Sequence, residues 1–400
     1  MSVGIIGGGV SGLCLGVLLA REGVEVTIYE RKNRVGKKLL ATGNGRANVS
    51  NVDLDRRHFH SRGTIPFDPS KTFSPEVRDL FFENLGIDLV EEDRGKLYPR
   101  PLQSQTVLNA LRRRFSEWGG VEVTDTFIAK IEKNKKGFLI HSNETTYCAD
   151  TVVVATGGLA MPESGSDGKG YALLEGFGHN KTRTFPGISA LVCQSPYLAH
   201  LSGTKIEGAI ALLKDGIEID RRKGEILLAK DGVSGPPVLD LARKVGESPG
   251  EYRVSFPMLN HLEQTEHYRE YLEGRSYLPD TVESFLEGVV SKKWVHVILK
   301  ECGIKGSDMM DSLEFDLRTK LLDLLFDFSL EVKGVRGFDY AQVTCGGIRI
   351  DEFTDHLESK RVEGLYAMGE VLDVDGDCGG YNIHWALAGA HRVAESILKK

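Results

Sequence analysis

The sequence predicts an α/β fold that begins with a Rossmann-like dinucleotide-binding domain. Residues 3–6 form a short apolar stretch that fits a buried strand, and the glycine-rich turn GGGVSG follows at once. An apolar helix is expected over residues 11–21, and alternating apolar residues predict a second strand over 24–29. Strand, glycine turn, helix and strand in this order form the unit that binds dinucleotides in Rossmann folds.

The glycine turn matches the pattern G-x-G-x-x-G through Gly7, Gly9 and Gly12. In such a turn the first glycine permits the tight bend and the second lets the backbone approach a pyrophosphate. The third lets the helix pack closely on the strand. The N–H groups of Val10 and Ser11 would open the helix, where such groups are unpaired and the helix dipole is positive. The turn is therefore the expected phosphate site.

Charged residues after the second strand indicate which dinucleotide binds. Glu30 ends this strand, where a carboxylate can accept hydrogen bonds from both hydroxyls of an adenosine ribose. Arg31 could instead contact a 2′-phosphate, but Glu30 would repel one, so FAD or NAD is expected. Lys37 and Lys38 could neutralise the pyrophosphate, although Lys37 also fits a solvated basic turn.

Two later stretches favour FAD over NAD because they return to what reads as the same sheet. TVVVATGG at 151–158 is an apolar strand that ends in the small residues Ala155, Thr156 and Gly157. Small residues are expected where the carboxyl end of a buried parallel strand meets a ligand. GLYAMGE at 364–370 repeats this pattern near the end of the chain.

The pattern of apolar residues changes between these two segments. Short alternating strands predict a small β-barrel or layered antiparallel sheet, with Asp215-Gly216 as a two-residue hairpin turn. Leucine and phenylalanine then recur at helical spacing, as in DSLEFDLRTKLLDLLFDFSLEV, for which core or domain-interface packing is the ordinary meaning. We expect an FAD-binding domain made from both chain ends, residues 1–185 and 331–400. A β-barrel-like insertion is expected over 186–258 and a helical cap over 259–330.

Several stretches resemble a bacterial family of FAD-dependent oxidoreductases described as aminoacetone-oxidase-like or BaiN-like, which are NAD(P)/FAD-dependent flavoproteins. The stretches at 36–51 and 364–382 are the most specific to that family. The matching segments cover nearly the whole chain: GIIGGGVSG, GKKLLATGNGRANVSN, GKLYP, VVVATGG, GSDGKGY, DGVSGP, VTCGG and GLYAMGEVLDVDGDCGGYN.

The resemblance implies further cofactor contacts. The backbone near Ile128 would touch the adenine, and Gly369 and Glu370 would meet the ribityl phosphate portion. The segment after DGDCGG is expected to present backbone N–H groups to the N1/C2=O edge of the flavin, where negative charge develops on reduction. The cofactor residues implied in this way are Gly43, Asn44, Arg46, Ile128, Gly369, Glu370, Gly380, Asn382 and Ile383.

Candidates for the substrate face of the flavin follow from the same stretches. His384 could transfer a proton near neutral pH, but it also fits a hydrogen-bonded structural histidine. Cys345 could attack a substrate, although a buried inert thiol is the alternative. The sequence departs from the family at Ala47, Lys230 and His384, so the substrate of a relative does not transfer directly. The candidate catalytic residues are Arg46, Tyr98, Thr344, Cys345, Tyr381 and His384.

Composition narrows the remaining choices. The 400 residues carry a formal net charge of −7, which argues against nucleic acid as a partner. The six cysteines include no C-x-x-C pair and fit reduced thiols in a cytoplasmic protein. The apolar N-terminus runs directly into the next element, so neither export nor membrane insertion is expected. His58 and His60 would share one strand face, but no third ligand is evident, so no metal is expected.

The sequence as a whole predicts an FAD-dependent oxidoreductase that moves hydride between a small organic substrate and flavin N5. The redox partner would be O2 or NAD(P)H, and NADH or NADPH would bind transiently because no second G-x-G-x-x-G is evident. A flavoprotein of RNA modification and a non-catalytic flavin sensor remain as alternatives. The sequence leaves the oligomeric state open.

Overall fold

The computed structural model describes residues 1–261 and 265–400. Contacts divide the chain into two compact units. The first unit joins Met1–Gly187 to Gly337–Lys400, and the second is Ile188–Arg336. The Rossmann-like domain is thus assembled from both chain ends, as the two glycine-rich returns predict.

A five-stranded parallel sheet forms the centre of the first unit, in the order β20-β11-β1-β2-β7. Its inner strand β11 is buried at every residue, which explains why TVVV reads as an unbroken apolar run. The predicted α/β class is confirmed by this sheet. The strands are β1 (Ser2–Ile6), β2 (Glu25–Tyr29), β7 (Val121–Val123), β11 (Thr151–Val154) and β20 (Leu365–Ala367).

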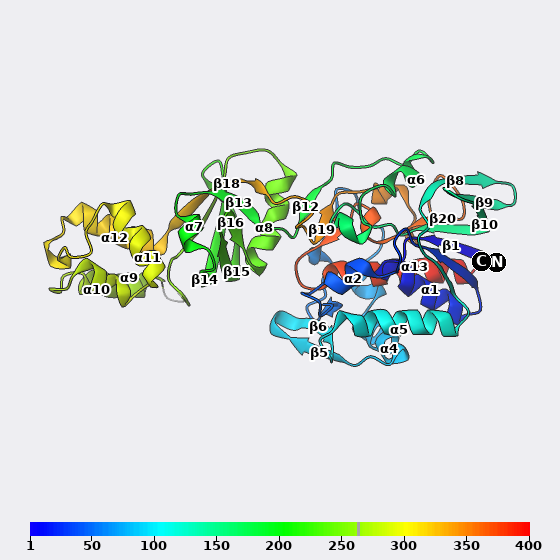
Figure 1. Ribbon diagram of the computed structural model, residues 1–400, viewed down its shortest axis with the longest axis horizontal. Coiled ribbons are helices and arrows are strands. Elements are labelled where there is room, and N and C mark those ends of the chain that lie inside the picture. Colours follow the sequence, from blue (N-terminus) through cyan, green and yellow to red (C-terminus); the bar gives the residue numbers. More distant parts are fainter. Residues whose placement is uncertain (262–264) are drawn as a thin grey trace. The chain divides into compact units, whose positions relative to one another are not determined.

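Helices α1 (Val10–Arg21) and α13 (Tyr381–Leu398) lie side by side along the sheet, with α5 (Ser104–Glu117) next to α1 (Figure 1). Close packing at α1 depends on glycine. A Cβ on Gly12 would stand 2.1 Å from the carbonyl oxygen of Gly7. The third glycine of the turn therefore has the packing role that the motif predicts.

Smaller elements surround this core and supply the edges of the site. The antiparallel group β3-β6-β5 and the two-stranded pairs β21-β4 and β12-β19 lie in the first unit. These elements are α2 (Lys37–Ala41), β3 (Ser50–Asn51), β4 (Phe59–His60), α3 (Pro69–Thr72), α4 (Pro75–Leu85), β5 (Leu89–Glu92), β6 (Lys96–Pro99), β8 (Ile128–Asn134), β9 (Gly137–Ser142), β10 (Thr146–Ala149), α6 (Tyr171–Glu175), β12 (Phe185–Gly187), β19 (Val343–Cys345) and β21 (Asp375–Gly376).

The second unit contains a closed six-stranded barrel, in the order β13-β16-β15-β14-β17-β18. The predicted hairpin is confirmed, because Asp215 and Gly216 join β14 to β15 with φ values of 51° and 82°. Two positive φ angles are what a type I′ turn requires. The strands are β13 (Leu191–Gln194), β14 (Lys205–Lys214), β15 (Ile217–Ala229), β16 (Gly232–Ser234), β17 (Tyr252–Phe256) and β18 (Phe328–Val335).

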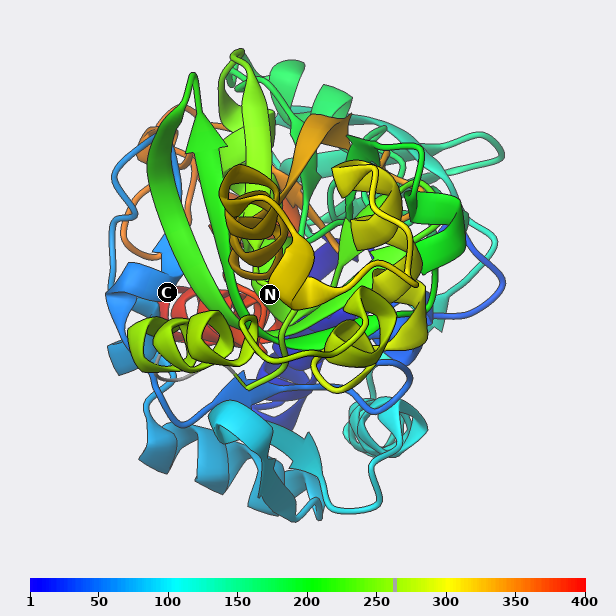
Figure 2. The same ribbon diagram turned by 90° about the vertical axis from the view of Figure 1, so that its left-hand side faces the viewer.

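Helices gather at one end of the barrel, shown in yellow in front of its green strands in Figure 2. The segment that the sequence reads as one helical stretch divides in two. Helix α12 ends at Phe326, and the alternating residues that follow form β18, which closes the barrel. The sequence-based boundary at 330/331 therefore lies inside β18. The helices of this unit are α7 (Leu198–Leu201), α8 (Pro236–Glu247), α9 (Thr265–Arg275), α10 (Val282–Glu287), α11 (Lys292–Cys302) and α12 (Phe315–Phe326).

No helix in the described part of the chain is long and apolar enough to cross a membrane.

Candidate functional site

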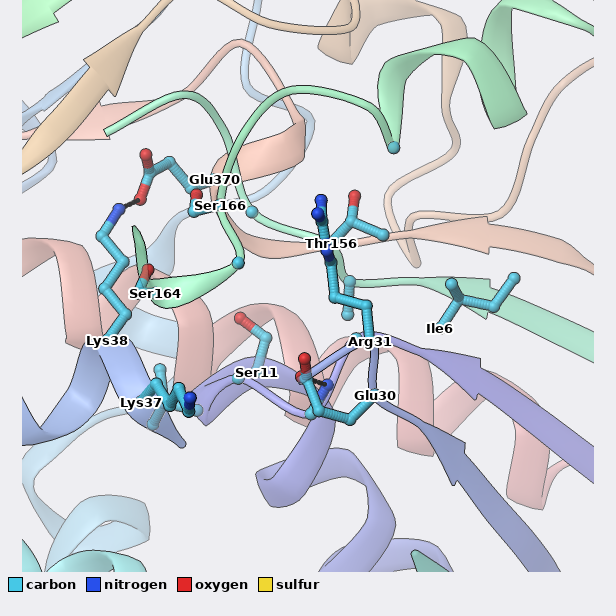
Figure 3. Close-up of a pocket in the computed structure, with 18 of the residues that line it drawn as sticks. Ile6, Ser11, Glu30, Arg31, Lys37, Lys38, Thr156, Ser164, Ser166 and Glu370 are labelled. Atoms are coloured by element: carbon cyan, nitrogen blue, oxygen red, sulfur yellow. Dashed lines mark hydrogen bonds and ion pairs between the residues drawn. The ribbon is translucent and has the colours of Figure 1, made fainter. Parts of the chain in front are cut away.

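A cleft opens in the first unit at the glycine turn between β1 and α1 (Figure 3). The space within it, including the part open to solvent, is about 1270 Å³. Its wall combines this turn with the ends of β2 and β11, the start of α2, the loop before α6 and the first turn of α13. Ligands of open α/β sheets bind at this place, outside the carboxyl ends of the strands. The cleft brings together most of the predicted cofactor residues: Gly7, Gly9, Val10, Ser11, Glu30, Arg31, Lys38, Ile128, Ala155, Thr156, Gly157, Glu370, Asn382 and Ile383.

Glu30 lies at the end of β2 with its carboxylate inside the cleft. Its two oxygens accept hydrogen bonds from the backbone N–H groups of Gly8 (2.9 Å) and Lys32 (2.8 Å). Burial raises the pKa of this carboxyl, although the two N–H donors favour the ionised form. Each oxygen keeps a further lone pair, so the ionised group can also accept from two adjacent ribose hydroxyls.

The floor of the cleft is open backbone at the start of α1. A Cβ placed on Gly9 would meet nothing within 4 Å, and no side chain caps this helix. In the wall, the hydroxyl oxygens of Thr156 and Ser166 are buried without a hydrogen-bond partner in the structure. Open N–H groups and unpartnered hydroxyls are what a bound phosphate-bearing dinucleotide would satisfy. The residues present therefore fit FAD.

Two ion pairs cross between the segments that form the wall. Lys38 of α2 lies 2.5 Å from Oε2 of Glu370, whose other oxygen accepts the N–H of Thr344 at 3.0 Å. Arg31 lies 2.5 Å from Asp167, a residue of the GSDGKGY loop. Ser166 and Asp167 are not among the site residues predicted from the sequence, although their loop, GSDGKGY, carries part of the family resemblance. The pairs hold α2 and this loop against the cleft.

The run DGDCGGYN turns the chain into the N-terminus of α13. Gly380 precedes the helix with a φ of 99°, and a Cβ there would stand 2.4 Å from the carbonyl oxygen of Ser50. No side chain caps α13. The side chain of Asn382 instead forms two hydrogen bonds with the backbone of Gly376. Its Oδ1 accepts from the Gly376 N–H and its Nδ2 donates to the Gly376 carbonyl oxygen, both at 2.8 Å. The first turn of α13 thus faces the cleft through Asn382 and Ile383 with its N–H groups available.

Some predicted cofactor residues do not line the cleft. Gly12 packs beneath the turn, and Gly369 lies against Ser11. Gly43 lies close to Tyr98 in the loop after α2, directly after the lining residue Thr42. The predicted cofactor residues outside the lining are Gly12, Gly43, Asn44, Arg46, Gly369 and Gly380.

Of the predicted catalytic residues, Arg46 and Tyr98 lie together. The guanidinium carbon of Arg46 stands 4.5 Å from the centre of the Tyr98 ring, and its Nη1 is 3.0 Å from Glu92. Burial raises the pKa of the Tyr98 hydroxyl. Tyr381 lies on the neighbouring turn and stacks on His58 with ring centres 4.3 Å apart. Arg46 lies in the loop after α2, Tyr98 on β6 and Tyr381 at the start of α13, and none of them lines the cleft.

Thr344 and Cys345 are buried on β19. The Thr344 hydroxyl accepts the N–H groups of Leu159 (2.7 Å) and Ala160 (3.0 Å), and thereby fixes the loop that follows β11. The Cys345 thiol lies 3.3 Å from Oδ2 of Asp375. The structure therefore supports a structural role for Thr344 and shows a carboxylate beside Cys345.

His384 is fully buried on α13. Its Nδ1 lies 2.9 Å from the Ser50 hydroxyl and its Nε2 lies 3.1 Å from the carbonyl oxygen of Pro69. Burial lowers the pKa of this ring to about 4, so it is neutral at neutral pH. Both ring nitrogens are engaged within the protein, which favours the structural alternative over proton transfer to a substrate.

His58, the last residue of the 3-10 turn before β4, and His60 of β4 both point toward one carboxylate. His58 Nδ1 lies 2.9 Å from Oδ2 of Asp377, and His60 Nε2 lies 2.7 Å from Oδ1 of the same residue. Within the described residues, no three histidine, cysteine or acidic side chains are arranged to hold a metal ion.

A Rossmann-type domain built from both chain ends, with a dinucleotide cleft at its glycine turn, is an architecture of flavoenzymes. Comparison with known proteins assigns this chain to the FAD-dependent oxidoreductases. It belongs to the family described as HI0933-like protein Rossmann domain, which it matches over residues 1–396.

Named relatives match the chain over nearly its whole length. It is 32% identical to 3-dehydro-bile acid delta(4,6)-reductase of Clostridium scindens, with 96% of each chain covered. It is 26% identical to ribosomal RNA dihydrouridine synthase of Haemophilus influenzae, with 99% of this chain and 98% of that protein covered. The Escherichia coli protein of the same name is also 26% identical, with 98% and 97% covered.

A solved structure supports the fold. The 3-ketosteroid-delta4-(5alpha)-dehydrogenase of Rhodococcus jostii RHA1 aligns with a TM-score of 0.51 and 14% identity. The alignment covers 100% of this chain and 96% of that one. At this identity the likeness concerns the fold alone.

Proposed function

We propose that this protein reduces a carbon–carbon double bond conjugated to a carbonyl group in a small organic substrate, with NAD(P)H as the reductant. The carrying observation is the full-length similarity to a delta(4,6)-reductase. Dihydrouridine synthases also saturate a carbon–carbon double bond, so both kinds of relative have names that describe the same type of bond reduction. The dinucleotide cleft is consistent with this chemistry.

Bound FAD would supply the hydride step at its N5 position. Glu30 would hold the adenosine ribose, and the N-terminus of α1 would bind the phosphates next to Lys38. The N-terminus of α13, at Asn382 and Ile383, would stabilise the negative charge that develops at the N1/C2=O edge. These assignments explain why the donors at the ends of both helices are left without side-chain caps.

Arg46 and Tyr98 are the proposed contacts for the carbonyl oxygen of the substrate. A cationic guanidinium and a phenol both donate hydrogen bonds, and such donors stabilise the enolate-type charge that forms on this oxygen. Glu92 fixes the guanidinium at 3.0 Å, and the Tyr98 ring lies against its face. Tyr381 and Cys345 are proposed for the surrounding wall, whereas Thr344 supports the loop after β11.

A small molecule is favoured over RNA as the substrate, although two relatives are named for action on ribosomal RNA. The chain has a net charge of −7. Residues 259–327 alone contain 14 acidic and 8 basic side chains. Such a surface repels a phosphate backbone, whose binding requires clustered lysine and arginine. RNA reduction is therefore the second candidate, and the cytoplasm is the proposed location for either.

The test begins with the visible spectrum of the purified protein, reconstituted with FAD where necessary. Anaerobic NADH or NADPH is added first, followed by a panel of conjugated enones and then by unmodified ribosomal RNA. We expect one nucleotide to bleach the flavin and an enone to restore its colour in the absence of O2. Recovery with RNA alone would select the second candidate. Recovery with O2 alone would make O2 the electron acceptor, and a flavin that never bleaches would favour a sensor.

A further inference from the structure

His60 is one half of a carboxylate–imidazole pair beside the turn that leads into α13. Its Nε2 lies 2.7 Å from Oδ1 of Asp377, and no described residue forms a hydrogen bond with its Nδ1. The His60 side chain is 30% exposed, whereas Asp377 is 17% exposed. A carboxylate on one ring nitrogen fixes the tautomer and orientation of a histidine and leaves the other nitrogen able to exchange a proton.

His58, at the end of the 3-10 turn before β4, has a different environment. Its Nδ1 lies 2.9 Å from Asp377 and its Nε2 lies 3.2 Å from Asp53, so both nitrogens face carboxylates. Hydrogen bonding to Asp377 raises the pKa of His58, which favours a cation held between two anions. His58 also stacks on Tyr381. It therefore orders the turn, while His60 keeps an open nitrogen.

The backbone of this pair is continuous with the cleft wall. Residue 375 of β21 pairs with His60 of β4 in the antiparallel register. Val374, the preceding residue, lines the cleft. Asn382 also lines the cleft and is bonded to Gly376 through both its oxygen and its nitrogen. The backbone of the pair thus adjoins the cleft wall where α13 begins, and the two side chains lie behind the residues that line the cleft.

We propose that His60, oriented by Asp377, donates the proton that completes reduction of the conjugated double bond. This inference rests on the proposed function. The hydride adds to the β-carbon, the carbon–carbon π bond breaks, and its electron pair passes to the α-carbon and carbonyl oxygen. The N–H bond of the His60 imidazolium breaks as the α-carbon–hydrogen bond forms. NAD(P)H supplies the electron pair, and solvent returns the proton to the neutral ring.

The charged and titratable groups around His60 and Asp377 favour an ionised Asp377 beside the His60 ring. Asp377 accepts from both histidines, and although burial opposes ionisation, these hydrogen bonds keep its pKa below the usual range. An ionised Asp377 balances the imidazolium that proton donation requires. His384, the other candidate acid, has both ring nitrogens engaged inside the protein. The groups around the pair are Asp53, Arg57, His58 and Tyr381.

The test separates the two half-reactions of the holoenzyme in His60→Gln. General acid catalysis contributes about 100-fold to 10,000-fold, so we expect reoxidation of the reduced flavin by an enone to slow by at least about 100-fold. Reduction by NAD(P)H and the midpoint of thermal unfolding should stay within the error of wild type. The matched control is His356→Gln, because His356 also binds an aspartate, Asp355, at 2.8 Å and has a 27% exposed side chain.

A second measurement does not depend on turnover. Histidine ring NMR signals of the FAD-free protein are compared in wild type and Asp377→Asn. Displacement of the His60 signals supports the pair, and unchanged signals overturn it. If the reduced flavin of His60→Gln is reoxidised by an enone at the wild-type rate, this inference is overturned and the proposed function stands. If no enone reoxidises the wild-type flavin, the proposed function fails and this inference fails with it.

Discussion

Lys38 and Glu370 are 332 residues apart in the sequence, yet the Lys38 ammonium lies 2.5 Å from the Glu370 carboxylate at the cleft. The pair joins α2, which follows the glycine-turn unit, to the segment after β20 near the other chain end. It connects the two parts of the chain that build one cofactor site. Because both residues line the cleft, a change at Lys38 tests directly what the pair contributes to FAD binding (Figure 3).

Replacing Lys38 should weaken FAD binding. In Lys38→Met the Glu370 carboxylate loses its cation and places an uncompensated negative charge near the phosphates of FAD. We expect the Kd for FAD to rise about 10-fold or more, equivalent to about 1.4 kcal/mol. Fluorescence titration of FAD-free protein measures this change. Lys71→Met is the control, because Lys71 is 85% exposed on α3. An unchanged Kd for FAD in Lys38→Met would show that Lys38 does not contribute to FAD binding.

Two glycines of one motif should respond differently to the same change. Gly9→Ala adds a Cβ that meets nothing within 4 Å, so the protein should fold while FAD affinity falls because the phosphate approach is narrowed. Gly12→Ala forces a Cβ to 2.1 Å from a carbonyl oxygen and should destabilise the fold by about 1–3 kcal/mol. Thermal unfolding and FAD titration of both variants test the contrast. Equal stability of the two would contradict it.

A half-buried histidine outside the cleft, His391, should make the protein acid-sensitive. The Nε2 of His391 is buried without a hydrogen-bond partner, and its ring packs against Phe73 and Phe81. Burial lowers the pKa of His391 to about 4 from the 6.5 of the unfolded chain. Its stability contribution is present above pH 6.5 and is lost as the pH falls toward 4, because the unfolded state then binds the extra proton.

His391→Leu should therefore stabilise the protein, by about 1 kcal/mol at pH 7, because an unpaired polar atom is removed. The advantage over wild type should grow by about 2 kcal/mol at pH 5. Unfolding curves of the first unit at both pH values measure these differences. An advantage independent of pH would show that His391 does not titrate in this way. The control, His356→Leu, alters a histidine whose side chain is 27% exposed.

Arg46 should affect substrate binding more than cofactor binding. Arg46→Lys keeps the positive charge but loses the planar contact with Tyr98 and the geometry of the bond to Glu92. We expect the KM for an enone to rise about 10-fold with the spectrum of bound FAD unchanged, because one oriented donor to the carbonyl is lost. Steady-state kinetics measure this. Arg100→Lys, at a 64% exposed side chain, is the control, and an equal KM in both variants would refute the role.

Local sequence patterns predict the elements that they themselves form. The strand, glycine turn and helix at the start of the chain, and the Asp215-Gly216 hairpin, depend on neighbouring residues and were predicted correctly. The closure of the barrel by β18 was missed because helical spacing in α12 runs straight into strand alternation. Periodicity alone does not locate such a change within one apolar segment.

Contacts between segments far apart in the chain could not be predicted from the sequence. The pairing of Lys38 with Glu370 and of Arg31 with Asp167 requires the fold, because nothing in a single sequence fixes which charges meet. The sequence predicts that His58 and His60 share one strand face, but only His60 lies on β4. Asp377, the carboxylate between the two rings, is more than 300 residues away in the sequence. The same limit explains why His384 could be interpreted either as an acid or as a buried structural residue.

Mass spectrometry of the organic product shows whether the protein reduces a conjugated carbon–carbon double bond. The protein, FAD and NAD(P)H are incubated without O2 with a conjugated enone that reoxidises the flavin. We expect a product heavier than the substrate by two hydrogen atoms, with its carbonyl group retained. Oxidation of NAD(P)H without any change in the mass of the organic compound would contradict it.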